Sequence, residues 1–167
     1  MKKGVFSRHD IRDHFRAPKA INEITFRQAG GRSQSSAPFL RRIRGRRVHH
    51  TDVMDCGGAY RALFVWRDGE IREKRSFYAW LFIAKGEKDL IPLARIDYHP
   101  SHKDLHILVN CEDSRDLTNR ALPGSRELTL TPLRALDPAE ELDRQTLIRR
   151  AMEIFGIEFA TPDGGLL

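Results

Sequence analysis

The chain has 167 residues, of which 40% are hydrophobic and 31% are charged. This length suits one domain with its own core, and the composition excludes a disordered chain and a small disulfide-rich scaffold. The basic start is not followed by an apolar run, and no stretch approaches the roughly 20 apolar residues of a membrane span. We therefore expect neither a signal peptide nor a membrane segment. The two cysteines, Cys56 and Cys111, are expected to be reduced thiols, which indicates a cytoplasmic protein.

Positive charge is concentrated at the N-terminal end. Residues 1–50 hold 13 Lys or Arg against 3 Asp or Glu, whereas the remainder holds 16 against 20. Within this part, the Arg41–Arg47 run has no aromatic residue on which bases could stack, so it favours contact with a nucleic-acid backbone or an acidic protein. We predict that residues 1–50 form a basic segment with a short helix and an Arg-rich loop, and that residues 51–167 form an α+β domain. The nucleic-acid contacts predicted in this run are Arg41, Arg42, Arg44, Arg46 and Arg47.

The first predicted element is a short helix in "FSRHDIRDHF". Ser7 is a good N-cap there, and Asp10 follows three residues later, near the positive end of the helix. Residues 20–28, "AINEITFRQ", indicate a short strand. Residues 29–38 are rich in Gly and Ser and predict a loop.

The middle of the chain predicts a β-meander. Asp68-Gly69, between two apolar runs, is typical of a two-residue hairpin turn. Residues 77–84, "FYAWLFIA", are apolar on both alternating faces, which predicts a central strand that is covered on both sides. Residues 85–89 predict the next turn, and further strands are expected at 90–98 and 105–110.

The C-terminal part predicts one more strand, at 127–132, and the clearest helix of the chain, within 137–155. Asp137 is a good N-cap, Pro138 suits the first helical position, and Gly156 ends the helix. The predicted fold is α+β: an antiparallel β-meander sheet of about five strands with this helix packed on one face. The apolar stripe expected to contact the sheet comprises Ile148, Ala151, Met152 and Phe155.

The best candidate site lies on the hairpin "ARIDYHPSHKDLHILVN", residues 94–110. Pairing that matches the apolar faces of the two strands sets Tyr98 opposite Leu105, and so sets Asp97 opposite His106 on the other face. Four polar side chains should converge there, with two more above them from the turn. These are Arg95, Asp97, His99 and His106, and, from the turn, His102 and Lys103.

Such a cluster suits cleavage of RNA without a metal. The reaction needs a base to deprotonate the 2′-hydroxyl, an acid to protonate the leaving oxygen, and cations for the phosphorane charge. Histidine titrates in the right range, and Asp97 would orient His106. The predicted catalytic residues are Asp97, His99, His102 and His106, and the predicted phosphate contacts are Arg95 and Lys103. No cofactor is expected for this chemistry.

Two other interpretations of the cluster stay open. Asp97, His99 and His106 offer three N/O ligands, which would suit a metal-dependent hydrolase. Alternatively, Asp97 and His106 form an ordinary cross-strand pair, and the protein is a non-catalytic adaptor that binds a polyanion or a protein through the Arg-rich segment. Residues 49–56, "HHTDVMDC", are a second zinc candidate. This candidate is weaker, because neither cysteine of the chain has a CxxC partner.

A β-meander with an exposed polar His cluster and a basic arm resembles, in general character, the small bacterial ribonuclease toxins of toxin–antitoxin pairs. The resemblance implies RNA as substrate and an antitoxin protein as partner. We therefore expect nucleic acid as the partner, with RNA favoured over DNA, together with an acidic protein such as an antitoxin, and no membrane.

Overall fold

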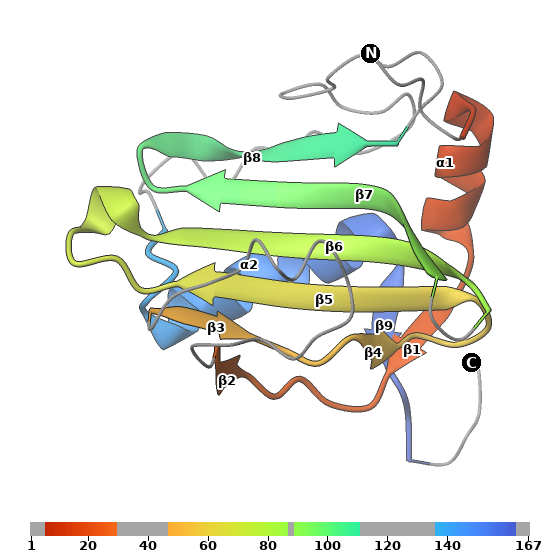
Figure 1. The fold of residues 1–167 in the computed structure, drawn as a ribbon, viewed down its shortest axis with the longest axis horizontal. Coiled ribbons are helices and arrows are strands. Elements are labelled where there is room, and N and C mark those ends of the chain that lie inside the picture. The colour runs from red at the N-terminus through yellow and green to blue at the C-terminus, as the bar shows by residue number, and fades with distance from the viewer. Residues whose placement is uncertain (1–5, 30–46, 87–88, 111–135, 163–167) are drawn as a thin grey trace.

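The computed structural model describes residues 6–29, 47–86, 89–110 and 136–162. These residues form one helix near each end of the described chain, strands between the two helices and one strand after the second helix (Figure 1). The elements are α1 (Arg8–Arg16), β1 (Lys19–Ile21), β2 (Arg27–Gln28), β3 (Val48–His50), β4 (Met54–Asp55), β5 (Tyr60–Arg67), the 3₁₀ turn η2 (Arg72–Lys74), β6 (Ser76–Lys85), β7 (Asp89–His99), β8 (His102–Val109), α2 (Glu141–Phe155) and β9 (Ile157–Phe159).

Most of these strands belong to one antiparallel sheet of seven strands. Its order is β2-β3-β5-β6-β7-β8, and β4 also pairs with β5. β1 and β9 form a separate parallel pair. The predicted α+β architecture is confirmed, and the short strands β2, β3 and β4 extend the sheet beyond the five strands expected. Figure 1 shows α2 behind the sheet and α1 at one end of it.

The two faces of the sheet are buried in two separate clusters. The face toward α2 carries the main core, in which Phe64, Phe77 and Ile96 are fully buried. The opposite face, here called the outer face, buries Leu63 and Phe82 among others. β6 contributes to both clusters, so its prediction as a central strand covered on both sides is confirmed. Full burial of each such side chain contributes roughly 1.5–3 kcal/mol.

The N-terminal helix packs into the main core. The predicted cap is confirmed, because the Ser7 and Asp10 side chains each accept a hydrogen bond from the other residue's backbone N–H, at 3.1 and 2.9 Å. Ile11 and Phe15 are buried, and the Phe15 ring lies 5.8 Å from that of Phe155 in α2. Part of the predicted basic segment thus shares the core of the sheet. A domain boundary at residue 50 stays a prediction.

Two details near the N-terminus and in the β5–β6 connection differ from the predictions. Residues 20–28 contribute to two strands in different sheets, β1 and β2, which residues 22–26 separate. Asp68-Gly69 is not a two-residue hairpin turn, because Arg67 pairs with Ser76 and the connection includes η2. A Cβ on Gly69 would lie 2.5 Å from the backbone of Lys74, so the glycine permits this close approach rather than a positive φ.

The C-terminal helix begins later than predicted. Its N-cap is Glu140 rather than Asp137, because the Asp137 carboxylate accepts the backbone N–H of Ala139 and pairs with Arg75, which holds a turn before the helix. Gly156 ends the helix as predicted, in the left-handed region with φ 68°, where a Cβ would collide with the Phe15 carbonyl oxygen. The predicted stripe packs on the core, with Ala151, Met152 and Phe155 buried and Ile148 half-buried. The strand predicted at 127–132 lies outside the described residues.

Candidate functional site at one end of the sheet

The β7–β8 hairpin has the predicted register at its centre. Ile96 pairs with Ile107, and Asp97 pairs with His106. The register then shifts, and His99 pairs with His102, so the uniform pairing that predicted Tyr98 opposite Leu105 ends at Asp97. Both residues are nevertheless buried as predicted. Since neighbouring residues on a strand alternate between faces, Asp97 and His106 share the outer face of the sheet.

Arg95 and Asp97 bind each other on this face. The Arg95 Nε and Nη2 atoms donate to the two carboxylate oxygens of Asp97, each at 2.6 Å. The guanidinium also lies over the ring of Trp80, 5.0 Å from its centroid. A bidentate pair of this kind is strong, and it occupies both oxygens of Asp97. The positive charge of Arg95 is therefore balanced within the protein.

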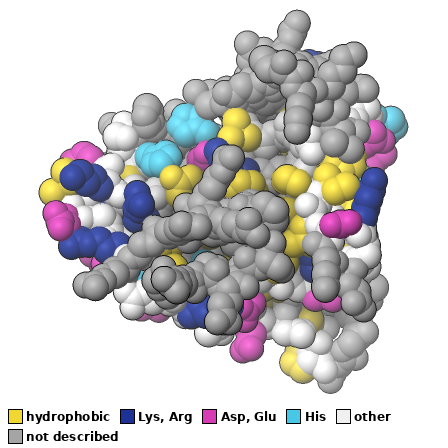
Figure 2. Space-filling view, in the orientation of Figure 1, with side chains coloured by type: hydrophobic (Ala, Val, Ile, Leu, Met, Phe, Trp, Pro, Cys, Tyr) yellow, Lys and Arg dark blue, Asp and Glu magenta, His cyan; other side chains and the backbone are white. Residues whose placement is uncertain are grey.

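His99 lies on the other side of the register shift and contacts Tyr78. The two rings meet edge to face, with centroids 5.6 Å apart and planes at 79°. Tyr78 on β6 is also the cross-strand partner of Asp97, so it lies beside both Asp97 and His99. Figure 2 shows histidine side chains at the surface over the β7–β8 end of the sheet, beside lysine and arginine side chains.

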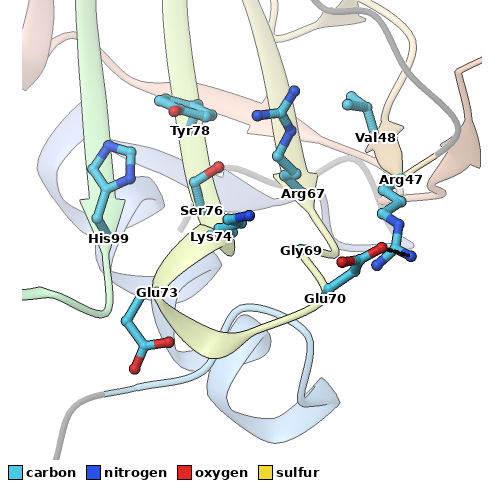
Figure 3. A pocket seen from close by; sticks show the side chains of 10 residues that line it. All are labelled: Arg47, Val48, Arg67, Gly69, Glu70, Glu73, Lys74, Ser76, Tyr78 and His99. Atoms are coloured by element: carbon cyan, nitrogen blue, oxygen red, sulfur yellow. Dashed lines mark hydrogen bonds and ion pairs between the residues drawn. The ribbon is translucent and has the colours of Figure 1, made fainter.

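A pocket of about 640 Å³ opens at this end of the sheet (Figure 3). Its walls come from the start of β3, the end of β5, the β5–β6 connection, the start of β6 and the end of β7. We call it the sheet-end pocket. The cationic, hydroxyl, aromatic and imidazole groups that line it belong to Arg47, Arg67, Lys74, Ser76, Tyr78 and His99.

Basic groups outnumber acidic ones among the described residues of the sheet-end pocket. Arg47, Arg67 and Lys74 face two carboxylates, Glu70 and Glu73. Arg47 donates to Glu70 Oε1 at 2.9 Å, in a pair whose side chains are 52% and 71% exposed, so solvent weakens it. Arg67 and Lys74 form no ion pair with any residue that the structure describes. The pocket therefore presents cationic groups to whatever enters it.

Ser76 and Tyr78 form the inner wall. Ser76 is only 3% exposed, yet it lines the pocket beside His99 and Arg67, as Figure 3 shows. Tyr78 is half-buried and packs against the cluster of the outer face. The wall thus combines a hydroxyl, an aromatic ring and an imidazole, which suits a ligand with both polar and flat apolar parts.

The predicted site residues are only partly brought together. His99 lies in the sheet-end pocket with Arg47, whereas Arg95 and Asp97 form a pair next to it and His106 lies opposite Asp97. The side chains of His102 and Lys103 lie outside the described residues, as do Arg41, Arg42, Arg44 and Arg46.

Sequence reasoning missed Arg67, Lys74, Ser76 and Tyr78. The period-2 alternation of β6 puts Ser76 and Tyr78 on one face, which was a usable signal. A two-residue turn at Asp68-Gly69, however, would have paired Arg67 with Glu70 and hidden the true partner, Ser76.

The metal interpretations receive no geometric support from the described residues. No group of three or more His, Cys, Asp or Glu among them is arranged to hold an ion. Cys56, part of the weaker zinc candidate, is 1% exposed, and burial raises the pKa of its thiol to about 11. Burial thus disfavours the thiolate that a zinc ligand or a nucleophile needs.

The fold and the pocket define an α+β protein with a basic pocket at one end of an antiparallel sheet. Comparison with protein families, curated proteins and solved structures found no match to the chain. Neither of the described helices is long and apolar enough to cross a membrane.

Proposed function

We propose that the protein binds RNA in the sheet-end pocket and cleaves its backbone without a metal, with His99 transferring a proton. One observation carries the proposal: the His99 imidazole lines a pocket together with three cationic side chains, Arg47, Arg67 and Lys74. An imidazole exchanges protons near neutral pH, and the cations attract a phosphodiester and stabilise negative charge that develops on it.

The reaction is an internal transfer at phosphorus. The 2′-oxygen attacks the adjacent phosphorus, the bond to the 5′-oxygen breaks, and a 2′,3′-cyclic phosphate forms. One group takes the 2′-hydroxyl proton and another gives a proton to the 5′-oxygen. We assign one of these roles to His99 and the other to His106, because both lie on the β7–β8 hairpin, where Asp97, two residues before His99, pairs with His106. Asp97, opposite His106, keeps that part of the face polar.

The test is a cleavage assay with purified protein on structured and unstructured RNA, with a chelator present. We expect His99→Ala to lower the rate by about 100-fold or more, the usual size of a lost acid or base. His106→Ala should also lower it. The matched control is His9→Ala, because His9 is exposed on α1 and pairs with Asp13 in the next turn. Cleavage that is the same in all three variants and in the wild type would rule out these roles.

A second candidate is a protein that binds RNA or an acidic partner without cleaving it. It is favoured by the position of Arg47, the last residue of the Arg-rich run, which lines the same pocket. Such binding would weaken steeply with salt and would be unchanged in His99→Ala. Binding without any RNA product would select this second function.

A further inference from the structure

The size and lining of the sheet-end pocket indicate which form of RNA it binds. We propose that it holds one unpaired nucleotide of a single-stranded segment, with the base against Tyr78 and a neighbouring phosphate on Arg67 and Lys74. This inference rests on the proposed function, since it names the substrate class of the same pocket.

The size of the pocket favours an unpaired nucleotide. Its volume of about 640 Å³ falls within the range of small-ligand sites, and its walls come from separate strands and a connecting loop. In an RNA duplex each base is stacked and paired inside the helix, so only the backbone and groove edges reach a protein surface. A base that enters a pocket must come from a single strand, a loop or a bulge.

The aromatic wall is fixed before a ligand arrives. Tyr78 packs against the buried cluster of the outer face, and the edge-to-face contact with His99 sets the relative orientation of the two rings. A ring that is held in place loses little conformational freedom when a base stacks on it. Stacking of one base on an aromatic side chain is worth about 1–3 kcal/mol.

The cationic wall lies at the other side of the pocket. Arg67 ends β5 and Lys74 lies in η2, and Figure 3 shows them away from His99, beyond Ser76. Within the described part of the chain, neither has a carboxylate partner, so a phosphate would not have to displace one. Ser76, which is 3% exposed and part of the inner wall, offers a hydroxyl to the sugar or the phosphate. The arrangement matches the two ends of a nucleotide.

Binding of short RNA that carries 2′-O-methyl groups tests this inference, because the blocked 2′-oxygen prevents cleavage. Fluorescence anisotropy compares one labelled single strand with the duplex that it forms with its complement. We expect the single strand to bind about 10-fold more tightly. Tyr78→Leu should lower single-strand affinity about 10-fold, which corresponds to about 1.4 kcal/mol, and should leave duplex affinity unchanged. Tyr78→Phe keeps the ring and should bind as the wild type does.

The outcomes separate this inference from the proposed function. Equal binding of strand and duplex, with no effect of Tyr78→Leu, would overturn the single-strand inference and leave RNA binding in place. A wild-type protein that binds neither form would overturn both. If Tyr78→Leu fails to fold, which thermal unfolding would show, the strand-to-duplex ratio of Tyr78→Phe and the wild type still decides.

Discussion

Two regions of the molecule differ in which groups bind their cationic side chains. Lys19, in β1, is 4% exposed, and its ammonium donates to the carbonyls of His14, Ala17 and Phe155, the last two at 2.7 Å. In the sheet-end pocket, Arg67 and Lys74 are exposed and have no carboxylate partner among the described residues. The ammonium of Lys19 is bound by the protein's own carbonyls, whereas Arg67 and Lys74 are accessible to a ligand.

The difference separates a cation that stabilises the fold from cations that bind. The carbonyls around Lys19 belong to the C-terminal ends of α1 and α2, where backbone oxygens lack partners within the helix and the helix dipole is negative. Burial lowers the pKa of Lys19 to about 8, because it disfavours the charged ammonium. The three carbonyl oxygens offset this cost by accepting hydrogen bonds from the ammonium. Mutations around Lys19 should change the stability of the fold, and mutations in the sheet-end pocket should change ligand binding.

The largest effect is expected at Lys19. Lys19→Met keeps the length and the apolar stem but leaves the three carbonyls without their shared donor, which should lower the free energy of unfolding by about 3 kcal/mol. Urea unfolding measures this change. The control is Lys85→Met, at the exposed end of β6, where we expect less than about 0.5 kcal/mol. Equal stability of the two variants would show that Lys19 does not hold the helix ends together.

A smaller effect, in binding alone, is expected in the pocket. Arg67→Gln and Lys74→Gln should each weaken binding of 2′-O-methyl RNA about 5- to 10-fold and reduce the slope of log K against log salt by about 1. Their unfolding free energies should stay within about 0.5 kcal/mol of the wild type. The control is Arg16→Gln, an exposed arginine in the last turn of α1. If Arg16→Gln reduces affinity as much as the pocket variants do, the cations act through net charge and not through a site.

The contrast between the regions also explains what the sequence could predict. Alternation and caps act locally, so β6 as a central strand, the α1 cap at Ser7 and the stop at Gly156 were all predicted correctly. The pairing of Asp97 with His106 followed from matching two apolar faces. The Phe155 carbonyl that accepts from Lys19 is implied by no local pattern, because it is 136 residues away.

The site was less predictable than the fold for the same reason. The role of Arg95 as a phosphate contact stays a prediction; a strand places residues two apart on the same face, and two N–H groups of Arg95 donate to Asp97 there. The pocket depends on the length of the β5–β6 connection, which determines that Arg67 pairs with Ser76. A turn dipeptide predicted a shorter loop, whereas Gly69 here permits a close approach to the backbone of Lys74 within the longer one.

The smallest effect should come from Glu70, which pairs with the pocket cation Arg47. Exposed pairs contribute about 0–1 kcal/mol, so an RNA phosphate that competes for Arg47 must overcome only that amount. Glu70→Gln removes the competitor, and we expect RNA affinity to rise about 2- to 4-fold with stability unchanged.

Glu153→Gln is the matched control, because Glu153 pairs with Arg150 on α2, in an exposed pair of the same kind. Both changes add one unit of net charge, so a general electrostatic effect would raise affinity equally in the two variants. A larger rise in Glu70→Gln would identify Arg47 as a group that passes from a protein carboxylate to a ligand phosphate. That exchange is what distinguishes the pocket cations from Lys19, whose carbonyl partners no ligand replaces.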